Sequence, residues 1–320
     1  MIIDFPTKDD FFNAATDYLN SSWDSVVELI SEFEKIVDLI DDSKHSVESE
    51  RYWGSAKQTL ISATALVQQA VEFYIKGRIA NVSPYLLISG SPQSWPKGCS
   101  KKDVEFSLFR TLDAQDLLKV HDTVCGTRFT DQFVQWYEKL RVIRNKVMHT
   151  VDKSLTVKPV EVIEFILFAY HYFSDTGSWF ESRKQYLDKT PVNSVQMFEE
   201  DNTESYTLNA LLNEFRTVME VLTPAKVKLY FNYNKTKRSL HCPSCYQVVS
   251  QMDFWDHEFI HDCAKTYQLT ESEGSYECCI CNYNYNGTLL SKMCEEECCE
   301  ERLIDSKSGL CLSCFCENAL

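Results

Sequence analysis

The sequence predicts a mainly α-helical protein that ends in a small, metal-stabilised module of mixed helix and strand. Three observations carry this prediction. Apolar residues recur at helical spacing through most of the first 190 positions, strand signals are scarce there, and twelve of the 14 cysteines fall between Cys242 and Cys316. A chain of 320 residues with 44% hydrophobic side chains is long enough for about two domains and a buried core.

Helices are expected wherever an apolar stripe persists between polar breaks. The expected helical segments are 11–19, 26–40, 56–74, 108–124, 133–147, 160–186 and 208–222. The segment 41–50 is a polar break, and 81–102 has the Pro, Gly and Ser content of a long loop. Thr223-Pro224 is expected to end the last of these helices, and the aromatic stretch 229–233 suits a short strand.

These elements predict four segments along the chain. They are an acidic helical N-terminal segment (1–50) that packs on a bundle, a helical domain (51–190), a connector with one helix (191–225) and a cysteine-rich module (226–320).

Charge is unevenly distributed among the segments. The whole chain has a net charge of −15, whereas residues 51–158 carry 16 Lys and Arg against 9 Asp and Glu. A phosphate backbone repels net anions, so only this middle segment and the short basic stretch 226–238 suit a nucleic-acid partner. The alternative is a solvated surface with a chance asymmetry of charge.

The sequence gives no sign of a membrane or secretory protein. No run approaches the roughly 18 apolar residues of a membrane span, and the first residues, MIIDFPTKDDFF, have neither a basic nor an apolar signal region. We therefore expect a cytoplasmic protein with reduced cysteines.

An arginine interrupts the apolar stripe of the segment 133–147. With Phe133 at 0° on a helical wheel, Tyr137 and Leu140 lie within about 40° of it, and Arg144 lies at about 20°. A guanidinium on an apolar face needs a carboxylate, a second subunit or an anionic ligand, unless it extends to solvent on its stem. His149, five residues on, is about 140° away from Arg144 on an ideal helix.

These residues carry a family resemblance. The sequence Arg-Asn-Lys-Val-Met-His at 144–149 resembles the Arg-x4-His motif, with Asn after Arg, of the HEPN superfamily. The upstream stretch 66–76 is similar to that family's earlier helix, which often reads Ala-x-x-Glu-x-x-x-Lys. The resemblance covers roughly residues 50–185 and implies a helical bundle that forms a homodimer and places two Arg/His sets in one cleft. It also implies a metal-independent ribonuclease of toxin–antitoxin or phage-defence systems, or an inactive RNA-binding or partner module.

The chemistry of these residue types fits RNA cleavage. RNA supplies its own nucleophile, the 2′-hydroxyl, and the imidazole of His149 can move that proton near neutral pH. Arg144 can hold the phosphate, and the Asn145 amide can orient the phosphate or His149. Glu72 lies in the matching earlier helix, where it either steers Arg144 or is an exposed helix carboxylate.

The C-terminal cysteines are expected to bind about two to three zinc ions with a structural role. The candidate ligands are Cys242, Cys245, His257, His261, Cys263, Cys278, Cys281, Cys294, Cys298, Cys311 and Cys314. Sequential filling would put Cys242, Cys245, His257 and His261 around one ion and Cys294, Cys298, Cys311 and Cys314 around another. Cys278 and Cys281 would then use Cys263, Cys299 or Cys316, or they would join Cys242 and Cys245 in a ribbon.

Two functions follow from the sequence. The first is an HEPN-type endoribonuclease that cuts RNA through 2′-hydroxyl attack with Arg144 and His149. The second is a non-catalytic dimerisation or RNA-holding module whose zinc-dependent tail contacts a protein partner. The retained Arg and His favour the first, and the overall acidity favours the second.

Overall fold

The computed structural model describes residues 1–37, 39–40, 44–149, 156–174, 177–194, 200–249, 265–269, 276–285, 289–290, 292–297, 299 and 303–319. They form two compact units, Met1–Phe173 and Ser174–Leu320. The chain thus divides about seventeen residues before the expected boundary at 190, because the helix at 179–187 packs on a helix of the second unit.

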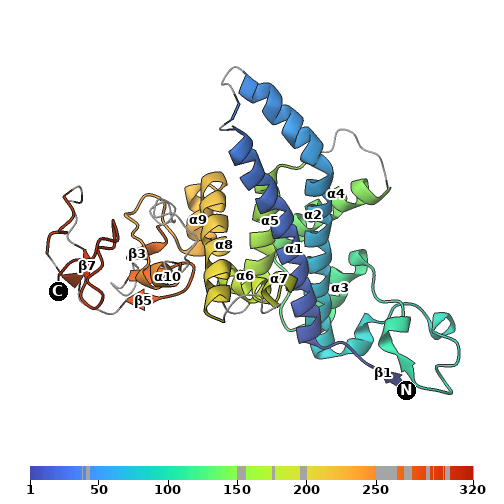
Figure 1. Ribbon diagram of the computed structural model, residues 1–320. Helices are drawn as coiled ribbons and strands as arrows, with labels where there is room; N and C mark the ends of the chain where they lie inside the picture. The colour runs from blue at the N-terminus through green and yellow to red at the C-terminus, as the bar shows by residue number, and fades with distance from the viewer. Residues whose placement is uncertain are drawn as a thin grey trace. The chain divides into compact units, whose positions relative to one another are not determined.

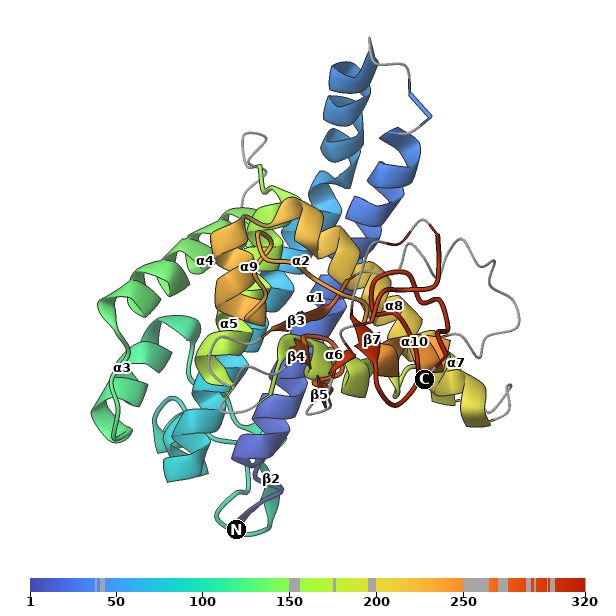
Figure 2. The ribbon, with the colours of Figure 1, turned by 90° about the vertical axis from the view of Figure 1, so that its left-hand side faces the viewer.

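The first unit is a helical bundle (Figures 1 and 2). Its main elements are β1 (Ile2–Ile3), α1 (Lys8–Val37), α2 (His45–Val82), β2 (Val104–Glu105), α3 (Ala114–Val124), α4 (Asp131–His149) and α5 (Pro159–Phe173). Short 3-10 turns occur at Pro84–Leu87, Pro92–Ser94 and Phe106–Leu108 within the long connection from α2 to α3, and β1 pairs with β2 in parallel.

Helix α1 continues through the first expected segment and most of the second, and it ends at Val37. Thr7 and Asp10 cap its start reciprocally, with the Asp10 amide donating to the Thr7 hydroxyl at 3.2 Å and the Thr7 amide donating to the Asp10 carboxylate at 2.8 Å. The polar stretch between the two stripes contains no Gly or Pro, and Ser21 bonds the backbone carbonyl four residues back. The helix therefore does not break there, and Trp23 is fully buried.

Helices α1 and α2 lie side by side along most of α1, as both ribbon views show. They approach closely at Gly77, where an added Cβ would lie 2.7 Å from a ring carbon of Phe12 and 3.1 Å from the Lys8 carbonyl oxygen. The absence of a side chain at Gly77 is what allows this contact.

Helices α3, α4 and α5 pack against α2 or α1. The apolar stripe predicted for the segment 133–147 is confirmed over its described part, because Phe133, Tyr137 and Leu140 are all fully buried, while the Val147 side chain lies outside the described residues. The single helix expected over 160–186 is wrong. Gly177 adopts a positive φ of 89°, and the Ser178 side chain caps a new helix by accepting from the Glu181 amide.

In its described part, the second unit combines helices with two small sheets, one of three strands and one of two. Its helices are α6 (Trp179–Leu187), α7 (Pro191–Ser194), α8 (Glu200–Val221), α9 (Pro224–Phe231) and α10 (Pro243–Val249). Its strands are β3 (Tyr267–Leu269), β4 (Tyr276–Cys278), β5 (Asn284–Tyr285), β6 (Leu289–Leu290) and β7 (Ile304–Asp305). The order β3-β4-β5 is antiparallel throughout, and β6 pairs with β7 antiparallel.

The strand expected at 229–233 is wrong, since most of that stretch is helix α9. Thr223 caps this helix through its side chain, Pro224 occupies the first helical position, and Asn232 ends it in a left-handed conformation with φ of 52°. Thr-Pro therefore ends α8 and also begins α9, because proline lacks the amide that a helix interior needs but a first turn does not.

The prediction of a mainly helical chain with its cysteine module at the C-terminal end is confirmed. No helix in the described part of the chain has the length and apolar character that crossing a bilayer requires.

Candidate functional site

The first cysteine cluster consists of Cys242, Cys245, Cys278 and Cys281. The first two lie at the start of α10, and the other two lie at the end of β4 and in the turn that follows. The Sγ atoms of Cys242 and Cys281 are 3.7 Å apart, and those of Cys245 and Cys278 are 3.8 Å apart. Pairing of β3 with β4 brings Cys278 and Cys281 next to Cys242 and Cys245.

The second cysteine cluster consists of Cys294, Cys299, Cys311 and Cys314. Its Sγ atoms are 3.6 Å apart between Cys294 and Cys314 and 3.7 Å apart between Cys299 and Cys311. A turn in which the Cys299 amide donates to the Glu296 carbonyl brings Cys299 back toward Cys294. Cys311 is fully buried, whereas Cys299 and Cys314 are partly accessible.

The geometry of both clusters suits a tetrahedral metal ion. Four sulfurs at about 2.3 Å from a central zinc form a tetrahedron whose edges are about 3.8 Å. The measured separations of 3.6 to 3.8 Å match this edge and far exceed the roughly 2.05 Å of a disulfide. Each cluster can therefore hold a metal ion such as zinc through four thiolates.

The ligand grouping differs from sequential filling. Cys278 and Cys281 join Cys242 and Cys245, which is the ribbon alternative, and Cys299 completes the second cluster. His257, His261, Cys263 and Cys298 lie outside the described residues. Sequential filling did not predict this position of Cys278 and Cys281, because their pairing with Cys242 and Cys245 depends on the β3–β4 ladder, which the cysteine spacing does not encode.

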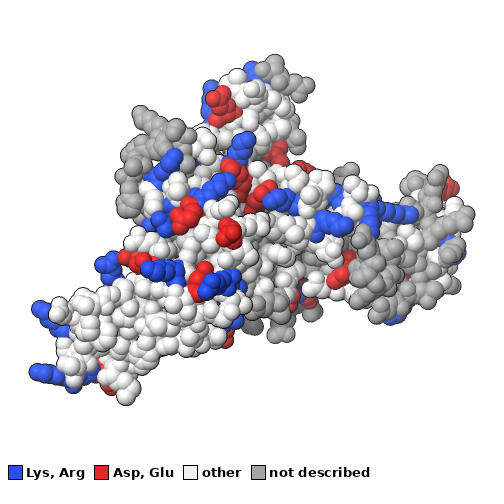
Figure 3. Space-filling view, turned by 180° about the vertical axis from the view of Figure 1, so that it is seen from behind, with Lys and Arg blue, Asp and Glu red and all other residues white. Residues whose placement is uncertain are grey.

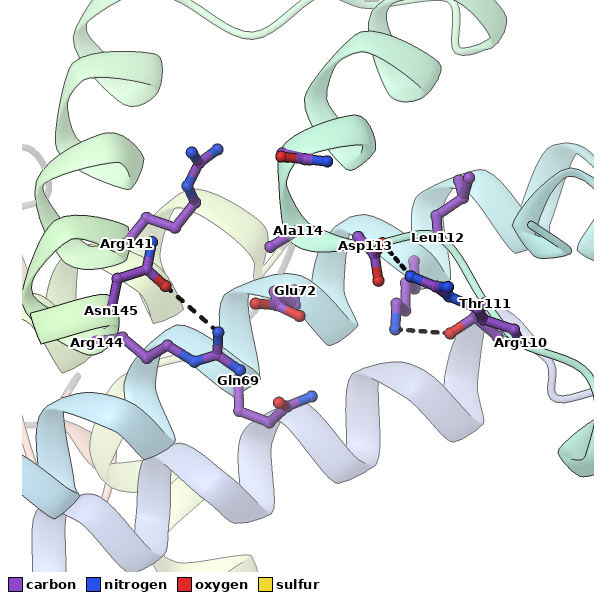
Figure 4. A pocket seen from close by; sticks show the side chains of 12 residues that line it. Gln69, Glu72, Arg110, Thr111, Leu112, Asp113, Ala114, Arg141, Arg144 and Asn145 are labelled. Carbon is purple, nitrogen blue, oxygen red and sulfur yellow. Dashed lines mark hydrogen bonds and ion pairs between the residues drawn. The ribbon is translucent and has the colours of Figure 1, made fainter. Parts of the chain in front are cut away.

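A polar pocket of about 530 Å³ lies in the first unit, between α2, α4 and the segment 110–115 that leads into α3 (Figure 4). Its lining residues are Gln69, Glu72 and Lys76 of α2, Arg110, Thr111, Leu112, Asp113, Ala114 and Gln115 of the connecting segment, and Arg141, Arg144 and Asn145 of α4. Four cations thus face two carboxylates, which makes the pocket suitable for an anionic ligand.

Glu72 is buried at the base of this pocket, with only 8% of its surface exposed. The Gln68 amide nitrogen donates to its Oε1 at 2.5 Å. Burial raises the pKa of the Glu72 carboxyl, and the nearby charges of Lys76 and Arg144 oppose that rise. The interpretation of Glu72 as an exposed helix carboxylate is therefore wrong.

Lys76 and Arg110 each have a partner at the pocket edge. The Lys76 ammonium donates to the Thr111 hydroxyl at 3.1 Å, and burial lowers the pKa of Lys76 while Glu72 and Asp113 oppose that change. The Arg110 guanidinium pairs with the Asp113 carboxylate at 2.7 Å. The first contact joins the segment 110–115 to α2, whereas the second lies within the segment.

Arg144 lies on the helix face that the wheel predicts, just beyond the buried part of the stripe. Its side chain is half-buried and points into the pocket, where Nη1 donates to Asn145 Oδ1 at 3.5 Å (Figure 4). Its charge also acts on Glu72. Helix α4 continues to His149, so the two residues do diverge around one helix, while the His149 side chain lies outside the described residues.

The pocket contains polar residues that sequence reasoning did not single out, chiefly Lys76, Arg110, Asp113 and Arg141. A signal for part of this set was present, since Gln69, Glu72 and Lys76 are spaced at i, i+3 and i+7 and so share one helix face. The contribution of the segment 110–115 depends on the path of a long connection and has no such signal.

Comparison of the chain with protein-family models, with curated proteins and with solved structures finds no match. The proposal of function therefore rests on the site and on the Arg-Asn-Lys-Val-Met-His motif at 144–149.

Proposed function

We propose that this protein is a metal-independent endoribonuclease of HEPN type that acts as a toxin or phage-defence effector, with its catalytic residues on α4 and its metal ions confined to a structural module. The observation that carries the proposal is the pocket in which Glu72 of α2 lies near Arg144 and Asn145 of α4 among four cations. The pairing of these two helices is also what the sequence resemblance implies.

In this proposal Arg144 binds the scissile phosphate and offsets the charge that grows on its oxygens. His149 takes the proton from the 2′-hydroxyl, whose oxygen forms a bond to phosphorus while the bond to the 5′-oxygen breaks. The departing oxygen takes up a proton, and the products are a 2′,3′-cyclic phosphate and a 5′-hydroxyl. Glu72 orients Arg144 through its charge, and the Asn145 amide holds the arginine or a phosphate oxygen.

The surface charge supports binding of RNA at the pocket and not across a broad basic face. On the face that Figure 3 shows, Lys and Arg side chains are interspersed with Asp and Glu over much of the surface. A chain with a net charge of −15 repels RNA from most approaches, so the four cations of the pocket provide a local attraction.

The decisive experiment incubates the purified, zinc-loaded chain with total RNA in the presence and absence of EDTA. We expect cleavage that survives the chelator during a short incubation and that is lost in His149→Ala. His171→Ala is the matched control, because His171 is an exposed histidine of α5 away from the pocket. Cleavage by His149→Ala at the wild-type rate would refute the proposal.

We also propose that the active cleft forms across the twofold axis of a homodimer, because Arg144 and His149 diverge by about 140° on one helix. Mixing an Arg144→Ala chain with a His149→Ala chain should restore part of the activity if each phosphate uses Arg from one subunit and His from the other. A mixture that stays inactive, or a strict monomer in sedimentation, would refute the composite cleft.

The second candidate function is an RNA-holding or dimerisation module whose zinc-dependent tail binds a protein. The observation that favours it is the acidity of the metal-binding segment 242–320, which carries 4 Lys and Arg against 14 Asp and Glu and so disfavours RNA as the partner of the tail. In that case the wild type and His149→Ala would bind RNA equally and neither would cleave it.

A further inference from the structure

The polar pocket has the chemistry of a base-recognition site. We propose that it binds one guanine nucleotide of single-stranded RNA, with the guanine base on the Glu72 carboxylate and the phosphate at the end of the pocket where Arg144 and Asn145 lie. This inference rests on the proposed function for the identity of the phosphate, and it adds a specificity-determining role for Glu72.

Gln68 uses only one of the roughly four acceptor positions of the Glu72 carboxylate, so both oxygens can still accept from a ligand. Gln68 donates to Oε1, which fixes the orientation of the carboxyl group on α2. Within the described part of the chain, no group donates to Oε2. Glu72 lines the pocket although the residue is 92% buried, so its accessible surface faces this cavity (Figure 4).

A buried carboxylate that faces a cavity selects a ligand with paired hydrogen-bond donors. Guanine presents two adjacent donors, N1–H and the N2 amino group, at the spacing of the two oxygens of a carboxylate. Adenine and cytosine present an amino group beside a ring nitrogen that accepts, and uracil presents one N–H between two carbonyl oxygens. Each of these places a lone pair against the carboxylate, so guanine is the base that Glu72 favours.

The other pocket residues supply what the rest of a guanine nucleotide needs. The side-chain amides of Gln69 and Gln115 can donate to the acceptor edge of the base, at O6 and N7. Arg144 and Asn145 lie at one end of the pocket for the phosphate. A volume of about 530 Å³ lies within the roughly 300–1,000 Å³ range typical of sites for small ligands and is sufficient for one nucleotide.

Charge balance also favours a ligand that carries both donors and an anion. The charges of Lys76 and Arg144 both act on the Glu72 carboxyl, and Asp113 pairs with Arg110. A phosphate alone would meet the buried carboxylate, and a base alone would leave the cations without a new partner. A nucleotide satisfies both.

The test is a binding measurement that does not depend on cleavage. The zinc-loaded full chain is titrated by calorimetry with GMP, with IMP, which lacks the N2 amino group, and with AMP. We expect GMP to bind at least tenfold more tightly than AMP, with IMP between them. In a parallel arm, a pentanucleotide RNA that contains one G is compared with the same RNA carrying A in its place, which distinguishes a strand from a free nucleotide as the ligand.

Two variants separate recognition of the base from binding of the phosphate. Glu72→Gln keeps an acceptor for Gln68 but loses the paired acceptors, so the preference for GMP over AMP should fall to about twofold or less. Arg144→Ala should lower the affinity for GMP and for AMP by a similar factor. Glu48→Gln is the matched control, because Glu48 lies on the same helix and pairs with Arg51 outside the pocket.

The outcomes of the guanine proposal and of the ribonuclease proposal can be told apart. Selective GMP binding that Glu72→Gln abolishes, in a chain that never cleaves RNA, supports the guanine site and refutes the nuclease. Equal affinity for GMP and AMP, no binding of either at millimolar concentration, or an unchanged preference in Glu72→Gln overturns the guanine site. RNA cleavage without a preference for G would then leave the nuclease standing alone.

Discussion

A buried ion pair between α6 and α8 provides a stringent test of how the second unit is held together. The Arg183 side chain is fully buried, and its Nε and Nη2 donate to the two carboxylate oxygens of Glu214 at 3.0 and 2.6 Å. The same two helices share a second pair, Lys184 to Glu204 at 2.9 Å, whose side chains are 44% and 60% exposed. The two pairs differ mainly in burial.

Glu214→Gln removes the negative charge and leaves a desolvated guanidinium with a neutral partner. Loss of one member of a buried pair costs roughly 3–5 kcal/mol, and because the glutamine carbonyl still accepts one hydrogen bond we expect a value near 3 kcal/mol. For a unit of this size that corresponds to a fall in Tm of about 6–12 °C. Glu204→Gln should cost about 0–1 kcal/mol, because water screens its pair.

The assay is thermal unfolding of the zinc-loaded chain by circular dichroism, together with hydrogen exchange of the amides of α8, which assigns the change to the second unit. Equal shifts in Tm for Glu214→Gln and Glu204→Gln would refute the reasoning. So would a change in exchange confined to the first unit.

Three further predictions concern the pocket and the cysteine clusters. Burial raises the pKa of the Glu72 carboxyl above the usual 4.5. The contribution of Glu72 to the free energy of unfolding of the wild type is therefore highest below pH 4.5, where the carboxyl is protonated, and it falls as the pH rises through the raised pKa. Glu72→Gln should therefore match the wild type in urea unfolding near pH 4 and exceed it at pH 7, and a variant less stable at pH 7 would contradict this sign. Arg144→Ala should abolish RNA cleavage in a gel assay while leaving Tm unchanged or higher, and cleavage at the wild-type rate would contradict its role. A metal-sensitive dye with excess EDTA should record metal release from the second cysteine cluster before the first. The reason is that two of the four cysteines are buried in the second cluster and three of four in the first. Release of the metal in a single phase would contradict this order.

The parts of the structure that sequence reasoning predicted correctly are those that local periodicity determines. The stripe of Phe133, Tyr137 and Leu140 depends only on spacing within one helix, and its burial is complete. The alignment of Arg144 with that stripe follows from the same wheel, and its side chain is half-buried. The approach of Glu72 to Arg144 came from resemblance, since two helices 50 residues apart in sequence carry no local signal of contact.

The errors arose where one signal has two meanings or where contacts are long-range. Thr223-Pro224 both ends α8 and begins α9, and only the first meaning was used. For Cys278 and Cys281 the sequence left the ribbon with Cys242 and Cys245 open as one alternative, and the strand ladder that selects it is not specified by cysteine spacing. The closing wall of the pocket depends on a connection of about 30 residues between α2 and α3, whose path follows from tertiary packing.

The close contact at Gly77 has a consequence for the pocket. Gly77 touches α1 on one side of α2, whereas Glu72 faces the pocket and is about 140° away around the same helix. A larger residue at position 77 requires the Phe12 ring to move, and it tightens the approach of α2 to the Lys8 backbone, which cannot swing aside like a side chain. The helix that carries the pocket carboxylate is therefore also the helix that packs on α1 at position 77, so a substitution there acts on α2 without changing any residue that lines the pocket.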